Sequence, residues 1–269
     1  MRFGILGPLF ISADEAASMP TAPKQRKLLA LLLLNANQLV SVSECVEELW
    51  EYDPPASAVA TLQTYVMQLR RFLRTGAAPC LASTERLITR DRGYGIVTRE
   101  GELDLAIYND KVRQGQTALA VGDDRTAARV LRGALSLWRG SALSDVQPGP
   151  LLNIQLAGLE ESRLGVLQQR IEADLRLGRH QELLSELSVL TRRQPLHESL
   201  HAQFMLALYR SGRQVDALQV FHRIRRVLAD ELGLSPSPPL QRLHEAVLSA
   251  DPCLEAPVAE TPPAIYSLI

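Results

Sequence analysis

The sequence predicts a mainly α-helical protein in two parts: an N-terminal part that combines short strands with a helix-turn-helix, and an all-helical part built from repeated helix pairs. Three observations support this prediction. A basic amphipathic helix is expected over residues 55–75, and a short hairpin with arginines at its tip over residues 86–98. Two helical segments, 174–184 and 208–218, align with each other. Hairpin signals stop near residue 103, where the all-helical part is expected to begin.

The composition is that of a globular protein with room for two domains. The chain has 269 residues, of which 46% are hydrophobic and 22% charged, and its net charge is -1. Residues 61–99 nevertheless hold seven arginines against two acidic residues, a local net charge of +5. Such a concentration of positive charge around a predicted surface helix favours a polyanionic partner such as nucleic acid.

No feature of the sequence indicates secretion, a membrane span or a cofactor. The three cysteines, Cys45, Cys80 and Cys253, are too few and too scattered for a disulfide framework or a CxxC metal site. The first ten residues lack the basic start and long apolar core of a signal peptide. No apolar run approaches the roughly 18 residues that a spanning helix needs. We therefore expect a cytoplasmic protein that binds no membrane and no cofactor.

The first elements are expected to be strands and two helices. Residues 2–11 are rich in β-branched and aromatic side chains, which favours short strands. The Leu-rich run from Pro23 to Asn37 predicts a buried helix with proline in its first turn. Ser43 is the expected N-cap of a short helix, SECVEELW, with Val46 and Leu49 facing inward. A proline-containing turn then leads into the basic helix.

The basic helix, PASAVATLQTYVMQLRRFLRT, has one apolar and one polar face. Val59, Leu62, Val66, Leu69 and Leu73 recur at steps of three and four and predict the buried stripe. The other face carries hydroxyl, amide and guanidinium groups but no acid, and its members are Ser57, Thr61, Thr64, Gln68 and Arg71, with Met67 and Arg74 beside them. Such groups read base edges and bind phosphates in a major groove. The alternative is an ordinary solvated surface helix.

The hairpin RLITRDRGYGIVT follows this helix after a polar loop. Arg90, Arg92 and two glycines fall at its expected tip, which could lie along a groove of nucleic acid as a wing. Helix, turn, longer basic helix and hairpin occur in the order of a DNA-binding helix-turn-helix domain. The alternative for the hairpin taken alone is an ordinary edge hairpin that has exposed arginines.

Three segments carry a family resemblance in this first part. RFGILGP, PPASAVATLQTYVMQLRR and RGYGI, with the order of elements around them, resemble the winged-helix domain of the OmpR/PhoB type as found in the Streptomyces antibiotic regulatory protein family. The resemblance implies a winged helix-turn-helix (α+β) domain with its recognition helix at residues 56–74. One departure is Met67, where related winged helices often carry a polar or basic residue, so a base contact is not expected there.

The resemblance also implies a set of DNA-contacting residues. In the recognition helix the candidates are Thr61, Thr64, Tyr65, Gln68, Arg70, Arg71 and Arg74. In the wing the candidates are Arg90, Arg92 and Tyr94. Lys24, Gln25 and Arg26 match the basic start of the family's first helix and could donate to a phosphate with help from the helix N-terminus.

The second part shows an internal repeat. DLRLGRHQELL aligns with LYRSGRQVDAL, and Gly178 and Gly212 lie one tetratricopeptide period apart. Stacked helix pairs of this kind bury a shared seam and present a concave face suited to another protein. GALSLWRGSALSDV, HAQFMLALYRSGRQVDALQVF and DELGLSPSPPLQRLH resemble the bacterial transcriptional activator domain that follows the winged helix in the same family. An all-α, tetratricopeptide-like domain is therefore expected.

The family resemblance implies a function. It indicates a sequence-specific transcriptional activator of a secondary-metabolite (antibiotic) gene cluster that binds direct repeats of double-stranded DNA as a homodimer and recruits RNA polymerase holoenzyme through its sigma factor and other subunits. Neither a P-loop nor a preceding receiver domain is found in the sequence. The alternative is a tetratricopeptide-type interaction adaptor whose winged helix has lost DNA binding.

One sequence motif points instead to an enzyme. His197, Glu198 and His201 spell H-E-x-x-H, which on one helix face could hold zinc. The longer zinc-protease pattern fails at Phe204 and Ala207, so we expect a chance match with no metal and no catalysis.

The expected domains are a winged helix at 1–99, a helical activator domain at 103–252 and a disordered tail at 253–269.

Overall fold

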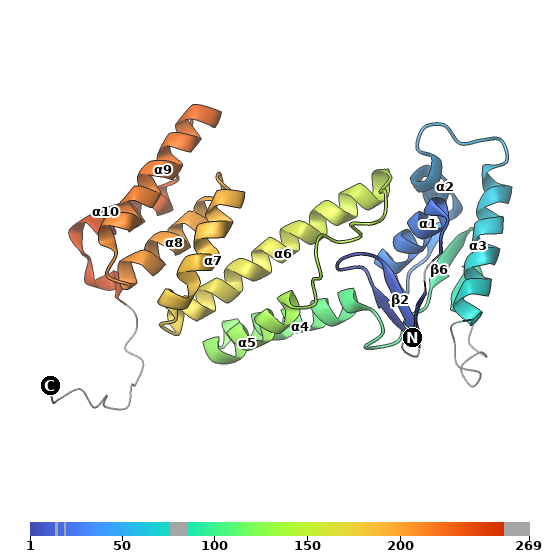
Figure 1. The fold of residues 1–269 in the computed structure, drawn as a ribbon, viewed down its shortest axis with the longest axis horizontal. Helices are drawn as coiled ribbons and strands as arrows, with labels where there is room; N and C mark the ends of the chain where they lie inside the picture. The colour runs from blue at the N-terminus through green and yellow to red at the C-terminus, as the bar shows by residue number, and fades with distance from the viewer. Residues whose placement is uncertain (14–15, 19, 76–85, 256–269) are drawn as a thin grey trace. The chain divides into compact units, whose positions relative to one another are not determined.

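The computed structural model describes residues 1–13, 16–18, 20–75 and 86–255 (Figure 1). They form two compact units: residues 1–113 with 133–165, and residues 114–132 with the chain from 166 onward. In the described part of the chain, no helix is long and apolar enough to cross a membrane.

The first unit begins with a small antiparallel sheet. Its strands are β1 (Arg2–Gly4), β2 (Phe10–Ala13) and β3 (Ala16–Ser18), in that order. Phe3 pairs with Ile11, and both side chains are buried. The strands expected near residues 2–11 are therefore present.

Three helices and a second sheet complete the winged helix. The helices are α1 (Pro23–Leu34), α2 (Val42–Trp50) and α3 (Ala58–Thr75). The second sheet has the order β4 (Val40–Ser41), β6 (Gly93–Ile96), β5 (Leu87–Arg90), all antiparallel. The six consecutive residues from Leu28 to Leu33 are all buried, so α1 is the central helix that the sequence predicted.

The N-cap of α2 differs from the prediction. Ser41, and not Ser43, caps this helix: its side chain accepts from the backbone N–H of Glu44, and the Glu44 carboxylate accepts from the backbone N–H of Ser41. These hydrogen bonds hold the pKa of Glu44 below its usual value. Leu49 faces inward as expected, whereas Val46 is only half-buried and Cys45 is buried in its place.

The first unit also contains residues beyond the winged helix. The Asp104 carboxylate accepts from the backbone N–H groups of Ile5 and Leu6 at 2.9–3.1 Å. Asp145 accepts from the N–H of Leu9 at 2.7 Å. Glu48 of α2 is fully buried, and its carboxylate accepts a hydrogen bond from the backbone N–H of Gly149, just before a later helix. The compact unit therefore extends past the predicted domain boundary at residues 99–103.

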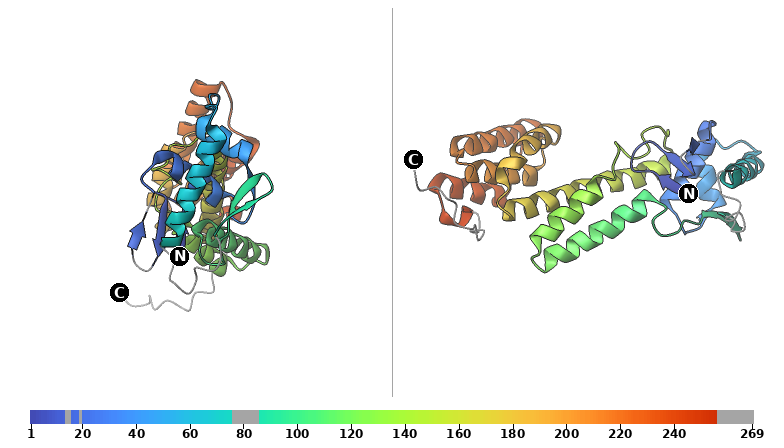
Figure 2. Two further views of the ribbon diagram at one scale, coloured as in Figure 1. Left: turned by 90° about the vertical axis from the view of Figure 1, so that its right-hand side faces the viewer. Right: turned by 60° about the horizontal axis from the view of Figure 1, so that its bottom comes forward.

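The remaining helices follow in sequence. They are α4 (Asp104–Ala120), α5 (Asp124–Leu135), α6 (Pro150–Arg176), α7 (His180–Arg193), α8 (Glu198–Arg210), α9 (Gln214–Leu232) and α10 (Pro238–Ser249). Helices α7 to α10 pack as successive antiparallel neighbours (Figure 2). A short 3-10 turn, Pro252–Leu254, ends the described chain and buries Leu254, so the tail predicted from residue 253 begins with ordered residues; residues 256–269 lie outside those described.

The second unit has an apolar seam and a buried ionic cluster. Met205, Leu208, Phe221 and Ile224 belong to the core shared by α8, α9 and α10. Asp174, only 1% exposed, pairs with three arginines: Arg132 at 2.8 Å, Arg170 at 3.4 Å and Arg179 at 3.0 Å. One buried carboxylate thus joins α5, α6 and the residue that precedes α7.

Candidate nucleic-acid interface

Helix α3 has the two faces that the sequence predicted, with one correction. Leu62, Val66, Leu69 and Leu73 are at most 2% exposed and pack into the first unit. Val59, the fifth member of the predicted stripe, is 49% exposed. Ala58 is buried instead, at 5%. The buried stripe is therefore rotated slightly from the predicted one, and Val59 belongs to the exposed surface.

The outermost row of α3 lies opposite this stripe. At about 100° per residue, Ala60, Thr64, Met67 and Arg71 point away from the core, and all four are exposed. The Thr64 hydroxyl donates to the carbonyl oxygen of Ala60 at 3.0 Å. Its proton is therefore used within the helix, so the exposed Thr64 side chain offers an acceptor oxygen and a methyl group but no donor.

Thr61 behaves in the same way on the side of the helix. Its hydroxyl donates to the carbonyl oxygen of Ser57 at 3.0 Å, and the side chain is half-buried. Of the two threonines that the sequence singled out, Thr64 alone is exposed on the outermost row.

One flank of α3 joins the N-terminus of α1 and the end of α2. The Gln25 amide nitrogen donates to the amide oxygen of Gln68. Tyr65 stacks on Trp50, with ring centroids 6.4 Å apart and planes 13° from parallel. The Lys24 ammonium lies 4.6 Å from the centroid of the Trp50 ring. The structure thus gathers Lys24, Gln25 and Gln68 on one flank of α3.

Trp50 is also a member of this cluster, although the sequence predicts only that it packs against helices. Its signal in the sequence is weak, because a tryptophan at the end of a short helix usually packs in the core. Here it is half-buried, and its ring interacts with both Tyr65 and Lys24.

Arg26 does not project outward as a phosphate ligand would. Its guanidinium forms an ion pair with Asp145, a residue 119 positions away in the sequence. Only 25% of the Arg26 side chain is exposed. Sequence patterns could not show this partner. The phosphate contact stays a prediction for Lys24 and Gln25, both of them half-buried, whereas Arg26 is already held by an acid.

The wing is held against α3 by Arg70. Its guanidinium donates to the Leu87 carbonyl oxygen at 3.0 Å and to the Thr89 hydroxyl at 2.7 Å. Strand β5 therefore lies beside α3, as Figures 1 and 2 show. Arg70 was predicted to face a groove, but the structure gives it the role of connecting the recognition helix to the wing.

Arginines occupy the wing tip, whereas Tyr94 lies inside the sheet. The turn between β5 and β6 consists of Asp91 and Arg92, and Asp91 adopts a positive φ of 49°. Arg90 and Arg92 are exposed, as predicted. Tyr94 is only 6% exposed, and this burial raises its pKa. Tyr94 therefore packs the wing and does not extend from it, contrary to the prediction.

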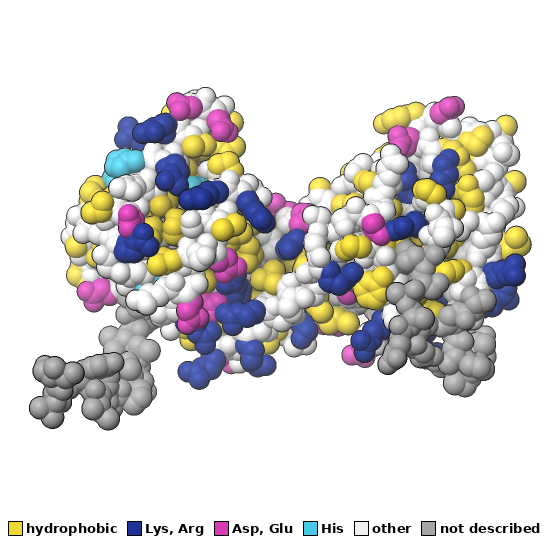
Figure 3. Space-filling model, viewed as in Figure 1, with side chains coloured by type: hydrophobic (Ala, Val, Ile, Leu, Met, Phe, Trp, Pro, Cys, Tyr) yellow, Lys and Arg dark blue, Asp and Glu magenta, His cyan; other side chains and the backbone are white. Residues whose placement is uncertain are grey.

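Positive side chains are spread over the visible face of the first unit. Figure 3 shows lysine and arginine side chains at several separate places, with hydrophobic and uncharged groups between them. The exposed arginines of the candidate interface are Arg71, Arg74, Arg90 and Arg92. They lie on two neighbouring elements, which suits contacts to phosphates on both sides of a groove.

The H-E-x-x-H motif is used for packing. His197 precedes α8 at the N-cap and lies 3.1 Å from the Gln168 amide through its Nε2. The Glu198 carboxylate accepts from the backbone N–H of Ser237 at 2.7 Å. His201 is 3% exposed. The first histidine is thus outside the helix that a zinc site of this type needs, and the glutamate ties α8 to the start of α10.

The burial of His201 predicts a pH-dependent stability. Desolvation lowers its pKa to about 4, against 6.5 for an exposed histidine. The unfolded chain therefore binds a proton below pH 6.5 that the folded chain does not bind until about pH 4. Between pH 7 and pH 5 the free energy of unfolding should fall by about 2 kcal/mol from this residue alone. Urea unfolding of the full chain and of His201→Leu at both pH values measures it; the same pH response in both proteins would contradict the assignment.

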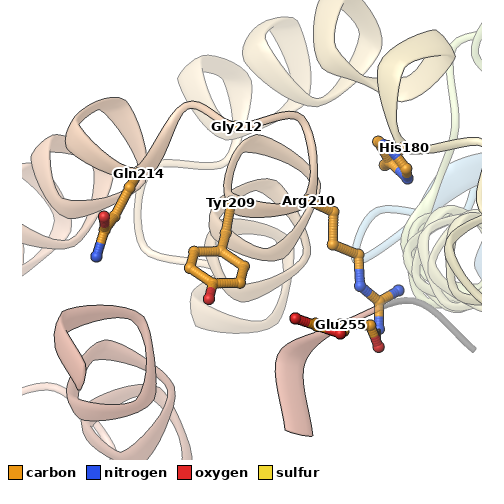
Figure 4. Close-up of a pocket in the computed structure, with 6 residues that line it drawn as sticks. All are labelled: His180, Tyr209, Arg210, Gly212, Gln214 and Glu255. Atoms are coloured by element: carbon orange, nitrogen blue, oxygen red, sulfur yellow. Dashed lines mark hydrogen bonds between the residues drawn. The ribbon is translucent and has the colours of Figure 1, made fainter. Parts of the chain in front are cut away.

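A pocket of about 530 Å³ lies in the second unit (Figure 4). Its lining includes His180, Tyr209, Arg210, Gln214 and Glu255. The Arg210 guanidinium donates to the carbonyl oxygens of Leu175, Leu254 and Glu255 at 2.8–3.3 Å. The charged group of this pocket is thus engaged in tying the end of the described chain to α8.

Comparison with known proteins identifies both parts of the chain. Residues 16–96 match the family described as "Transcriptional regulatory protein, C terminal", and residues 103–248 match "Bacterial transcriptional activator domain". The chain is 44% identical to the regulatory protein DnrI of Streptomyces peucetius over 98% of both chains. It is 42% identical to the regulatory protein AfsR of Streptomyces coelicolor over 97% of this chain but only 26% of AfsR.

A solved structure has the same fold. Mycobacterium tuberculosis EmbR, determined in complex with a low-affinity phosphopeptide, superposes with a TM-score of 0.87 at 33% identity over 93% of this chain and 65% of the EmbR chain. The predicted fold class, a winged helix followed by a helical domain, is thereby confirmed. The chain belongs to the Streptomyces antibiotic regulatory protein family, whose members are DNA-binding transcriptional activators and not enzymes.

Proposed function

We propose that α3 enters a major groove of promoter DNA while the wing tip holds the neighbouring backbone or minor groove. The observation that carries this proposal is the exposed face of α3, which presents Thr64, Gln68 and Arg71 and has no acidic residue between Ala58 and Thr75. The absence of carboxylates from this stretch favours DNA, because carboxylates repel phosphates. Arg90 and Arg92 provide the second point of attachment.

We further propose that the DNA consists of direct repeats upstream of a secondary-metabolite gene cluster. Two protomers on adjacent repeats would present their helical units to RNA polymerase holoenzyme and raise transcription. Family membership supports this proposal, as does the stack of helix pairs α7 to α10, an architecture common in protein-binding domains. Linking two weak sites through one dimer raises occupancy by effective concentration.

Footprinting of the full chain on the promoters of its own gene neighbourhood tests the proposed DNA target. We expect protection of two or more direct repeats, with an affinity that falls steeply as salt rises, because several phosphates are neutralised. In-vitro transcription with RNA polymerase holoenzyme, at matched occupancy of the operator by the protein, tests whether the protein recruits the polymerase. An adaptor without DNA binding would give neither protection nor salt dependence, and that result would overturn the proposal.

Gln68 and Arg71 are predicted to differ in what they recognise. Gln68→Ala should reduce discrimination at one base pair by about 1–3 kcal/mol, since its amide can bond to a base edge. Arg71→Ala should weaken binding to all sequences alike and lower the salt slope by about one, since its guanidinium faces phosphate. Affinities for a set of single-base-pair operator variants, measured at three salt concentrations, separate the two effects. An unchanged preference profile for Gln68→Ala would show that the assigned face is wrong.

A further inference from the structure

The middle of the outward face of α3 is apolar. Met67 is 62% exposed, and it lies on the outermost row between Thr64 and Arg71. Ala60 is exposed one turn before Thr64 in the same row. Because the Thr64 hydroxyl donates to the Ala60 carbonyl oxygen, the methyl group of Thr64 adds to this apolar strip. The strip thus consists of Ala60, Thr64 and Met67.

The polar groups of α3 lie beside the strip and at its end. Gln68 is on one flank, where Gln25 contacts it. Gln63 and Arg74 are exposed on the other flank, and Arg71 continues the outermost row. A large exposed apolar side chain at the centre of a polar helix face gains nothing in folding stability. With α3 in a major groove, however, DNA would cover this side chain, and burial of its apolar surface would then contribute to binding.

The major groove offers one apolar group among the four bases. Adenine, guanine and cytosine are distinguished there by their hydrogen-bond donors and acceptors, whereas thymine presents its C5-methyl group beside the O4 acceptor. An unbranched thioether side chain adapts its three rotatable bonds to such a contact. Met67 is three residues from Thr64 and four from Arg71, a rise of about 4.5–6 Å or one to two base-pair steps.

We propose that the strip of Ala60, Thr64 and Met67 reads the C5-methyl group of a thymine in each recognised repeat, with Met67 as the main contact. This inference rests on the proposed function, because it requires α3 to lie in the major groove. It changes the expectation for Met67 from a position without a base contact to a specificity-determining one.

A methyl-deletion scan tests the inference with the full chain. Duplexes enriched from a random 30-base-pair library by the wild-type protein serve as the probe, and each thymine in turn is replaced by deoxyuridine, which removes only the methyl group. At one thymine per repeat this replacement should weaken wild-type binding about fourfold, the value of one buried methyl group. Met67→Ala should bind the thymine duplex more weakly by a similar factor and lose almost nothing further on deoxyuridine.

Two variants control this comparison. Met67→Leu keeps an apolar side chain and should retain most of the thymine preference. Gln63→Ala changes an exposed neighbour outside the strip and should leave the deoxyuridine penalty unchanged. Because Met67 is exposed, its replacement should not alter the melting temperature of the protein.

The outcomes separate this inference from the proposed function. Enrichment of a sequence in which no thymine methyl matters, or a deoxyuridine penalty that is the same in the wild type and in Met67→Ala, would overturn the inference and leave the proposed function standing. Failure to enrich any sequence would overturn both. A penalty that disappears in Met67→Ala and persists in Gln63→Ala would support the inference.

Discussion

Glu48→Ala is expected to lower the free energy of unfolding by about 3–5 kcal/mol, because it removes a buried acceptor of three charge-assisted hydrogen bonds. The Glu48 side chain is fully buried. Its carboxylate accepts from the backbone N–H of Gly149 at 2.6 Å, Leu151 at 2.9 Å and Leu152 at 3.1 Å. These donors lie at the start of α6, where the helix dipole also favours a negative charge.

The backbone at Gly149 packs tightly against Glu48. A Cβ atom on Gly149 would lie 2.4 Å from the carbonyl oxygen and 2.8 Å from the carboxyl group of Glu48. Glycine is therefore required where α6 begins, and the donors cannot easily move to new partners. Once Glu48 is removed, three buried or half-buried N–H groups lose their acceptor.

Chemical denaturation of the full chain measures the effect. Glu47→Ala is the matched control, since Glu47 is the exposed neighbour in the same helix and its loss should change stability by less than about 0.5 kcal/mol. Glu48→Gln should fall between the two, because the amide oxygen can still accept from some of the donors. Equal stability of Glu47→Ala and Glu48→Ala would contradict this account of how α2 is held.

The triple variant Arg71→Ala, Arg90→Ala, Arg92→Ala is expected to bind operator DNA about a hundredfold more weakly at 0.15 M salt. The three arginines are exposed on α3 and at the wing tip, where we place the phosphate contacts. Each lost contact should lower the salt slope by about 0.9, so the slope should fall by nearly three in total. Sequence preference should remain, since base-reading groups are unchanged.

Arg192, Arg193 and Arg226 provide the control for net charge. All three are exposed in the second unit, and replacing them with alanine removes the same charge. Titrations at four salt concentrations compare the two triple variants. If both lose affinity equally, long-range charge and not contact by α3 and the wing would explain the binding.

Local sequence patterns predicted the helices and the identity of α3. The apolar stripe was found from its steps of three and four, but steps of this kind fit Ala58 as well as Val59 at the stripe's first position. The prediction placed Val59 in the stripe because it is the larger apolar residue, but the structure buries Ala58 there and leaves Val59 exposed. The N-cap of α2 could have been found, because Ser41 and Glu44 have the spacing of a capping box.

Local sequence patterns could not predict contacts between residues that are far apart in the sequence. Glu48 reads as a surface residue of a short amphipathic helix, and Arg26 as a free cation. Their partners, Gly149 and Asp145, lie 101 and 119 residues away. Trp50 and Tyr94 likewise depend on which elements meet in space. These contacts decide which candidate site residues are exposed. The sequence therefore predicted the elements of the candidate site, whereas the exposure of Arg26, Arg70 and Tyr94 had to be corrected from the structure.

The same contacts bear on the domain boundary predicted at residues 99–103. The matched family models are separated at this point, between residues 96 and 103. The compact first unit, however, includes residues 133–165. A fragment that stops at residue 100 would lack the acceptor Asp104 and the donors at Gly149 and Leu151. Such a fragment is large enough to fold, but the Glu48 carboxylate would have no N–H donors from Gly149 and Leu151, which would lower its stability.

Photo-crosslinking tests most directly whether α3 is the element that meets the bases. A benzophenone side chain is placed in the full chain at Ala60, which is exposed on the outermost row of α3, or at Ile154, which is 72% exposed on α6 in the same unit. The account predicts crosslinks from position 60 to bases within each recognised repeat and none from position 154. Crosslinks to bases from position 154, with none from position 60, would contradict it.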